Sequence, residues 1–88
     1  MPSGGLTVLS EIASCHKVVG LKQSARALRE GSVRKVFFAC DADPMVLMKL
    51  ETLCMEQGVT VEKDSTMAQL GQAAGIAVGA AVIALLKD

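Results

Sequence analysis

Three basic side chains at helical spacing, Lys22, Arg26 and Arg29, are the first feature of the sequence that could do chemistry. Gln23 stands beside them, and an amide side chain can both donate a hydrogen bond to a nucleic-acid base and accept one from it. The free backbone amides at the start of a helix attract phosphate groups, and nearby basic side chains add to that attraction. A solvated helix face explains the same spacing, so the pattern alone leaves phosphate binding and simple solvation open.

Residues that could support catalysis or metal binding are few and poorly placed. Cys15 and His16 are adjacent, and neighbouring helix positions point about 100° apart, which disfavours a nucleophile and base pair. We interpret His16 as a partly buried residue at a helix end. Asp43, directly before a proline, is typical of a helix cap, and Asp41 of a turn. Motifs of phosphate-binding loops, zinc proteases and serine hydrolases are absent, so we predict no enzyme, metal or cofactor.

The composition suits one folded domain over residues 1–88, with 51% hydrophobic and 20% charged residues. Only two residues are aromatic, which excludes modules that stack nucleic-acid bases on a platform of aromatic rings. The net charge is zero, yet residues 1–35 carry six basic and two acidic side chains, whereas residues 36–88 carry three and seven. The basic half can attract an anionic partner. Three cysteines without a CxxC pair favour the reducing cytoplasm.

The first half of the chain is predicted to alternate short helices with strands. We predict a helix over residues 6–14, a brief strand over residues 17–21, and a helix over residues 22–30 that Gly31 ends. The continuous apolar run at residues 36–40 indicates a strand that is covered on both faces.

The next helix has the strongest local signals. Asp43 can accept hydrogen bonds from free amides at its start, Pro44 suits the first helical position, and Gly58 ends it. Its predicted apolar side consists of Val46, Leu47, Leu50, Leu53 and Cys54.

The last part of the chain continues the alternation. We expect a strand over residues 59–62, then a helix that Asp64 or Ser65 caps and that closes near Gly75, and a final strand from residue 76 onward. Strands that alternate with helices predict a layered α/β domain.

Residues 67–86 are uncharged, and three glycines at four-residue spacing resemble the contact seam of paired membrane helices. A tail-anchored membrane protein is therefore an alternative. Two glutamines, many small residues, and a capping signal followed by a central glycine favour instead a short helix and a strand. We therefore expect no membrane partner.

Three motifs in order connect the chain to a known family: GLKQSARAL at residues 20–28, DADP at residues 41–44 and LGQAAGIAVGAA at residues 70–81. Together with Gly31, they resemble the ribosomal protein L7Ae/L30e superfamily, above all its small bacterial members. The resemblance extends from about residue 18 to residue 86. It implies a three-layer α/β/α sandwich on a four-stranded mixed sheet. In many members it also implies binding of kink-turn RNA, which bends sharply at a bulge flanked by sheared G·A pairs.

The resemblance further implies which residues contact RNA. Residues 20–23 enter the groove beside the G·A pairs, Arg26 approaches the backbone, and the loop of residues 75–79 packs against bulged nucleotides. The RNA-binding residues so predicted are Gly20, Leu21, Lys22, Gln23, Arg26, Ile76, Ala77, Val78 and Gly79. Bulged, deformed RNA is also the usual target of sequence-specific proteins, because the regular A-form major groove is too narrow to read.

The sequence departs from the family pattern at two places. Lys22-Gln23 stands where archaeal and eukaryotic members commonly carry Asn-Glu, and Ala77 stands where an acidic residue is frequent. An amide in place of a carboxylate, with an added positive charge, predicts weaker base reading and a larger phosphate contribution.

We therefore expect a monomeric, cytoplasmic, non-enzymatic protein that binds kink-turn RNA, with ribosomal RNA and ribosomal proteins as candidate partners. The main alternative is a protein-interaction module that keeps the fold but has lost RNA binding.

Overall fold

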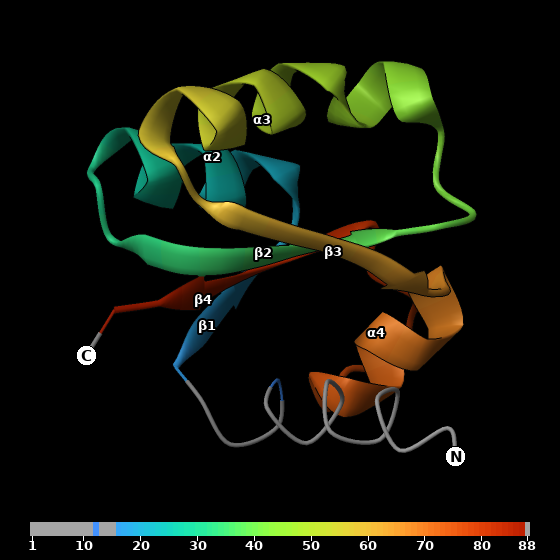
Figure 1. The fold of residues 1–88 in the computed structure, drawn as a ribbon. Coiled ribbons are helices and arrows are strands. Elements are labelled where there is room, and N and C mark those ends of the chain that lie inside the picture. The colour runs from blue at the N-terminus through green and yellow to red at the C-terminus, as the bar shows by residue number, and fades with distance from the viewer. Residues whose placement is uncertain (1–11, 13–15, 88) are drawn as a thin grey trace, which may run out of the picture.

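A four-stranded mixed sheet lies between helices in the computed structural model, which describes residues 12 and 16–87. The elements are β1 (Lys17–Val19), α2 (Leu21–Arg29), β2 (Val33–Ala39), α3 (Pro44–Gln57), β3 (Thr60–Ser65), α4 (Met67–Ala73) and β4 (Val82–Leu86). The strand order is β1–β4–β2–β3, with β2 and β3 parallel and the other pairs antiparallel. Helices α2 and α3 cover one face of the sheet and α4 covers the other (Figure 1), which confirms the predicted three-layer α/β/α sandwich.

Strand β2 supplies apolar side chains to both faces of the sheet. Val36 and Phe38 pack in the core beneath α2 and α3, while Phe37 and Ala39 pack in the core on the side of α4. Successive side chains of a strand point to opposite faces, so one apolar run serves two layers. The prediction of a strand covered on both faces is confirmed. The strand begins earlier than expected, at Val33, because its pairing with β4 extends that far.

Helix α3 begins and ends as predicted. The Asp43 carboxylate accepts a hydrogen bond from the Met45 amide at 2.9 Å, and Gly58 adopts a left-handed φ of +68° at the other end. The predicted apolar side of α3 is buried or partly buried except at Val46, which is 46% exposed. Val46 is apolar but not buried, because it lies on the wall of a groove between α2 and α3.

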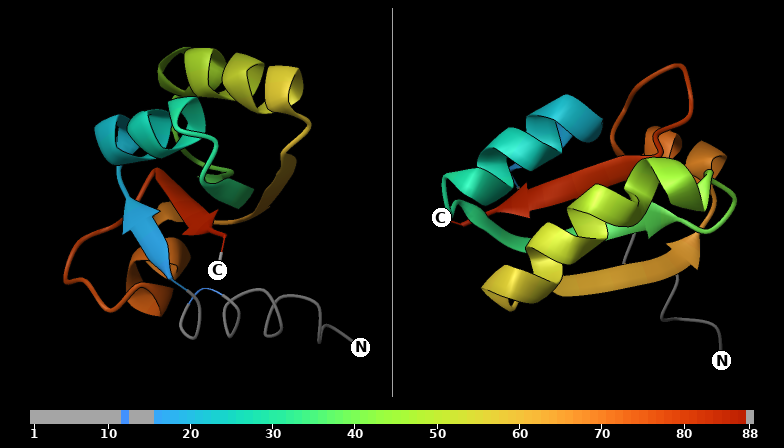
Figure 2. Two further views of the ribbon diagram at one scale, coloured as in Figure 1. Left: turned by 90° about the vertical axis from the view of Figure 1, so that its left-hand side faces the viewer. Right: turned by 90° about the horizontal axis from the view of Figure 1, so that it is seen from above.

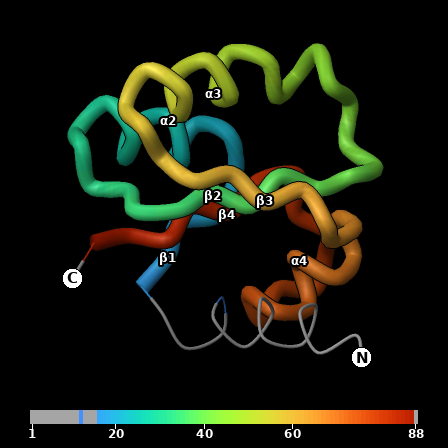
Figure 3. The backbone as a smooth tube through the Cα atoms, viewed as in Figure 1, coloured from blue at the N-terminus to red at the C-terminus, as the bar shows by residue number. Residues whose placement is uncertain are grey.

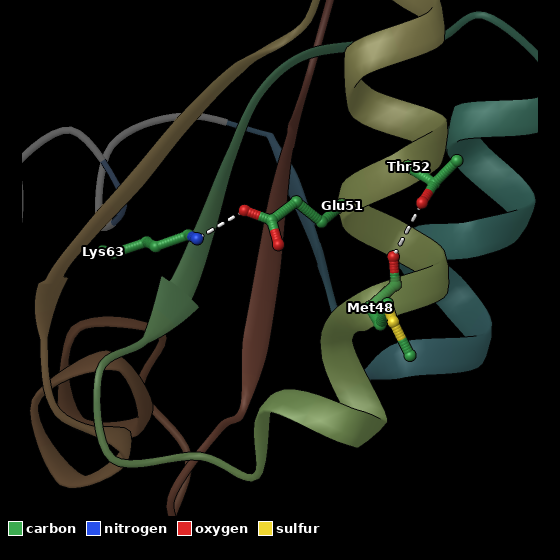
Figure 4. A network of polar contacts seen from close by, with 4 residues as sticks. All are labelled: Met48, Glu51, Thr52 and Lys63. Carbon is green, nitrogen blue, oxygen red and sulfur yellow. Dashed lines mark hydrogen bonds and ion pairs between the residues drawn. The ribbon is translucent and has the colours of Figure 1, made fainter.

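Polar side chains of α3 bond to neighbouring elements and to the backbone of α3 itself. Lys63 of β3 donates to the Glu51 carboxylate of α3 and, on the same helix, Thr52 Oγ1 donates to the Met48 carbonyl at 3.1 Å (Figure 4). The Gln57 side-chain amide donates to the Leu28 carbonyl near the end of α2. Figure 3 traces the chain from β2 through α3 to β3, the long connection that a parallel strand pair requires.

Helix α4 is capped by residues that the sequence analysis did not choose. Thr66, and not Asp64 or Ser65, is the N-cap, and its side chain accepts from the Gln69 amide at 3.2 Å while the Gln69 side chain accepts from the Thr66 amide. Ser65 is the last residue of β3 and is buried. Asp41 also contributes, because its carboxylate accepts from the Met67 amide at 2.8 Å. Asp41 therefore does more than form a turn.

Several predicted boundaries were wrong by a few residues. The brief strand ends at Val19 rather than at residue 21, and β3 extends three residues beyond residue 62. The largest error is β4, which begins at Val82 rather than at residue 76, because the intervening backbone folds back on α4 instead of pairing with a strand.

The N-terminal prediction is tested only in part. The predicted helix over residues 6–14 lies outside the described residues except for Ile12, which is helical and fully buried. His16 directly precedes β1 and is exposed, so the prediction that it is partly buried was wrong, while the helix end beside it lies outside the described residues. In the described part of the chain, no helix combines the length and apolar character that crossing a membrane requires.

Candidate nucleic-acid interface

Strand pairing brings two predicted contact segments to one end of the sheet. Val19 at the end of β1 pairs with Ile83 near the start of β4, and the Gly20 amide donates to the Val82 carbonyl at 3.0 Å. Gly20 directly precedes α2, and Val82 directly follows the loop that leaves α4. In both views of Figure 2 this loop and the start of α2 lie toward the same side of the molecule. The two segments are far apart in sequence and come together only through the fold.

Gly20 gives α2 an unusual start. Its φ of +102° lies in the region that L residues with side chains rarely adopt, while a Cβ built there would meet no atom within 4 Å. The backbone conformation, and not lack of space, therefore requires glycine. Gly20 has no side chain that could cap the first amides of α2. In addition, the first turn of α2 carries no acidic residue. This end of the helix keeps its attraction for anions.

The side chains of α2 divide into a buried side and an exposed side, and the three basic residues at helical spacing lie on the exposed one. Leu28 is buried against the sheet and Leu21 packs partly buried on the same core, while Lys22, Gln23 and Arg26 are exposed. Arg29 is exposed too, which completes a surface that we call the basic stripe: Lys22, Arg26 and Arg29. Within the described residues, Arg26 forms an exposed ion pair with Glu30, whose Oε2 lies 3.4 Å from Arg26 Nε.

The loop of residues 75–79, which we call the apolar loop, is uncharged and outward-facing. Its backbone is fastened at both ends to α4, because the Ile76 amide donates to the Gly71 carbonyl and the Ala80 amide to the Met67 carbonyl, each at 3.0 Å. Between these anchors Val78 is 72% exposed. The predicted residues Ile76, Ala77, Val78 and Gly79 are all exposed. The loop therefore presents aliphatic side chains to solvent from a fixed backbone.

Close packing on α4 depends on Gly71. A Cβ at this position would lie 2.1 Å from the Val78 carbonyl oxygen, far inside van der Waals contact. Gly79 meets α4 from the other side, where a Cβ would lie 3.1 Å from the Met67 Cβ. Gly71 and Gly79 therefore allow the loop to approach α4 closely, whereas Gly75 adopts a left-handed φ of +78° and a Cβ there would meet no atom within 4 Å.

Gly71 and Lys49 were not among the predicted site residues. The glycine spacing was a usable signal for Gly71, although it suggested a different role. Lys49 is an isolated cation in the acidic half of the chain, and only the packing of α3 beside α2 brings it to a groove with Arg26 and Arg29. Nothing in the sequence near Lys49 indicates this neighbourhood.

The residues that could have carried catalysis or bound metal are used otherwise. Among the described residues, no group of three or more histidine, cysteine, aspartate or glutamate side chains is placed to hold a metal ion. Asp41 and Asp43 both accept hydrogen bonds from helix amides. Burial, with a smaller contribution from Glu51, raises the pKa of the Cys54 thiol, which disfavours the reactive thiolate. Cys15 lies outside the described residues.

Comparison with known proteins identifies the family. The model of the ribosomal protein L7Ae/L30e/S12e/Gadd45 family matches residues 10–88, and the chain belongs to this family. It is 44% identical over 70 residues to an RNA-binding protein of Geobacillus sp. (strain WCH70), covering 80% of this chain and 85% of the relative. It is 34% identical over 68 residues to the large ribosomal subunit protein eL8 of Haloquadratum walsbyi, covering 76% and 57%.

The fold has a close counterpart among solved structures. The 15.5 kD RNA-binding protein of Giardia lamblia superposes with a TM-score of 0.83 at 24% identity, covering 98% of this chain and 74% of that chain. At this identity the likeness concerns the fold alone.

Proposed function

We propose that this protein binds structured RNA of the kink-turn class, with the start of α2 beside the sheared G·A pairs and the apolar loop against the bulged nucleotides. The observation that carries the proposal is the pairing of β1 with β4, which puts a basic, uncapped helix start and an exposed aliphatic loop at one end of the sheet. Curated relatives named as RNA-binding proteins support it. The proposed contact residues are Gly20, Leu21, Lys22, Gln23, Arg26, Ile76, Ala77, Val78 and Gly79.

The start of α2 would supply attraction and some base reading. Lys22 and Arg26 meet phosphates, and the absence of a side chain at Gly20 lets the RNA backbone approach the free amides. Gln23 offers an amide to the exposed edges of the G·A pairs. Leu21 packs partly on the core of the domain, so it holds the helix start in place rather than reaching far into the RNA.

The apolar loop would supply recognition of shape. Ile76 and Val78 cover an extruded base with aliphatic surface, which suits a protein with no aromatic residue besides Phe37 and Phe38. Ala77 adds no carboxylate that would repel phosphate. Because the loop is fastened to α4 at both ends, little backbone ordering is needed on binding.

A titration with matched kinked and straight duplexes at one salt concentration tests this proposal. The straight duplex replaces the sheared G·A pairs by Watson–Crick pairs, which removes both the exposed base edges and the bend. We expect it to bind several kcal/mol more weakly, because each good contact with a base edge contributes about 1–3 kcal/mol. Equal affinities would reject kink-turn recognition and favour a nonspecific binder or a protein-interaction module.

The salt dependence of binding measures the contribution of phosphate contacts to the proposed RNA binding. With at most about four to six phosphate contacts from the basic half of the chain, the log–log slope of affinity against salt should be shallower than about −5. This contribution is common to all RNA and should be nearly the same for the kinked and straight duplexes. A slope that differs strongly between them would mean that the bend changes the number of phosphates contacted.

We further propose that the cellular target is ribosomal RNA or another structured RNA in the cytoplasm. The similarity to a large ribosomal subunit protein supports a ribosomal target. Crosslinking in cells, followed by sequencing of the bound RNA, should give sites concentrated at kink-turn motifs. Crosslinks spread evenly over abundant RNA would contradict a specific target.

A further inference from the structure

A groove with a volume of about 670 Å³ lies between α2 and α3. Its apolar lining comes from both helices: Leu21, Ala25, Val46, Leu50 and Leu53. Its charged lining consists of four cations: Lys22, Arg26, Arg29 and Lys49. This is the size of a pocket that takes several side chains or a small ligand.

The charge of the groove is of one sign. Among the described residues that line it there is no carboxylate, although residues 36–88, which include α3, are acidic as a whole. Arg26 is paired with Glu30, while no described residue pairs with Lys22, Arg29 or Lys49. Such a groove attracts a group that is negative and rejects one that is positive.

We propose that this groove docks an acidic amphipathic segment of a partner protein, whose aliphatic side chains fill the floor and whose carboxylates meet the four cations. The mixed lining favours protein over RNA, because one peptide segment can place aliphatic side chains along the whole floor between two helices and carboxylates on the cations at its edges, whereas RNA would have to extrude a base into the groove to match the floor. Met45, one turn before Lys49 on α3, does not line the groove but is 73% exposed. Flexible methionine side chains adapt readily to a docked partner.

The proposed groove and the proposed RNA surface overlap but are not the same. They share Leu21, Lys22 and Arg26, whereas Arg29, Lys49 and Val46 belong only to the groove. Substitutions at Lys49 and Val46 can therefore test the groove without touching any proposed RNA contact. Both residues are exposed enough for substitution, and Val46 is outside the core cluster beneath α2 and α3.

The experiment uses a displayed library of random 16-residue peptides selected against the full chain. We expect the selected peptides to combine aspartate or glutamate with leucine, isoleucine or phenylalanine. Lys49→Glu and Val46→Asp should each weaken a selected peptide at least tenfold in fluorescence anisotropy. The matched controls are Lys87→Glu, a charge reversal at an exposed lysine outside the groove, and Met55→Asp, a carboxylate on another exposed part of α3. Both should change affinity less than twofold.

Three results would overturn the proposal. These are the absence of any selected binder, peptides without enrichment of acidic residues, and equal losses in the groove variants and the controls. Kink-turn RNA is titrated against the same variants, and a tenfold loss there with unchanged peptide binding would assign the groove to RNA instead. Thermal unfolding checks that each variant is folded. If Val46→Asp unfolds, Lys49→Glu and Val46→Ser decide.

A failure of this proposal is separable from a failure of kink-turn binding. Peptide binding to the unsubstituted chain, with loss in Lys49→Glu, supports the groove even if kinked and straight duplexes bind equally. Conversely, discrimination between the duplexes supports RNA recognition even if no peptide is selected.

Discussion

The start of α2 and the apolar loop occupy one end of the sheet but are positioned by different physical means. The helix start is fixed from within, because Ser24, Ala27 and Leu28 are buried against the domain and the Gly20 amide is bonded to β4. The loop is held by α4, because the Val78 carbonyl packs so closely on residue 71 that only glycine fits there. The first segment carries charge and the second carries none. Substitutions should therefore separate long-range attraction from recognition of shape.

The largest effect is expected from Gly71→Ala, which tests the support of the loop. The new methyl group would lie 2.1 Å from the Val78 carbonyl oxygen, so either the apolar loop or α4 must move. Overpacking of this kind costs about 1–3 kcal/mol, against a gain of up to about 1 kcal/mol in helix propensity. We expect a lower free energy of unfolding in urea and weaker binding of kinked RNA.

Gln72→Ala is the matched control for Gly71→Ala, because it changes an exposed neighbour on the same helix. It should leave both the free energy of unfolding and the RNA affinity nearly unchanged. A stability of Gly71→Ala equal to or above that of the parent would show that the loop is not held by this contact.

The second largest effect is expected from Val78→Asp. At 72% exposure this substitution should change stability by no more than about 0.5 kcal/mol. A carboxylate packed against bulged nucleotides would lose hydration and repel phosphate, so affinity for kinked RNA should fall by about tenfold or more. Val78→Thr separates charge from shape and should retain most of the affinity. Normal binding by a folded Val78→Asp variant would remove the loop from the proposed site.

Arg26→Glu probes the start of α2 and should weaken the binding of kinked and straight duplexes by similar factors. Its side chain is 77% exposed and its ion pair with Glu30 contributes little to stability, so unfolding should shift by no more than about 0.5 kcal/mol. Affinity should fall for kinked and straight duplexes alike, and the salt slope should become shallower by about one. Lys87→Glu controls for net charge. An unchanged slope would exclude Arg26 from phosphate contact.

These contrasts also explain which features the sequence could predict. The limits of α3 follow from signals within one turn, namely the Asp43 cap, Pro44 and the left-handed Gly58. The burial of β2 on both faces follows from its continuous apolar run, and the exposed stripe of α2 follows from helical periodicity. The layered α/β class followed from the alternation of elements, whereas the strand count and the contact residues came from the family resemblance.

Features that depend on distant partners were not predictable in the same way. Asp41 caps α4 across 26 residues, and the segment before β4 bonds to α4 although its apolar residues suit a strand. Lys49 joins the basic stripe only because α3 packs beside α2. At the proposed RNA surface, periodicity anticipates the exposure of Lys22, Gln23 and Arg26, whereas the contact loop came from the family resemblance. Contacts of these residues with RNA remain predictions.

The smallest effect is expected from Glu30→Gln, which sharpens the electrostatic half of the comparison. Glu30 Oε2 lies 3.4 Å from Arg26 Nε, so its carboxylate competes with phosphate for the same guanidinium. Removing an exposed charge of this kind changes the binding free energy by less than about 1 kcal/mol. Salt reduces the effect further, because the Debye length is about 10 Å at 0.1 M salt. We expect RNA affinity to rise about two- to threefold at low salt and to equal that of the parent at high salt, a gain well inside that limit.

Glu56→Gln, an exposed change on α3, is the control and should have a smaller effect. A loss of affinity in Glu30→Gln would reverse the interpretation, because it would mean that the ion pair orients Arg26 toward the RNA rather than competing with it.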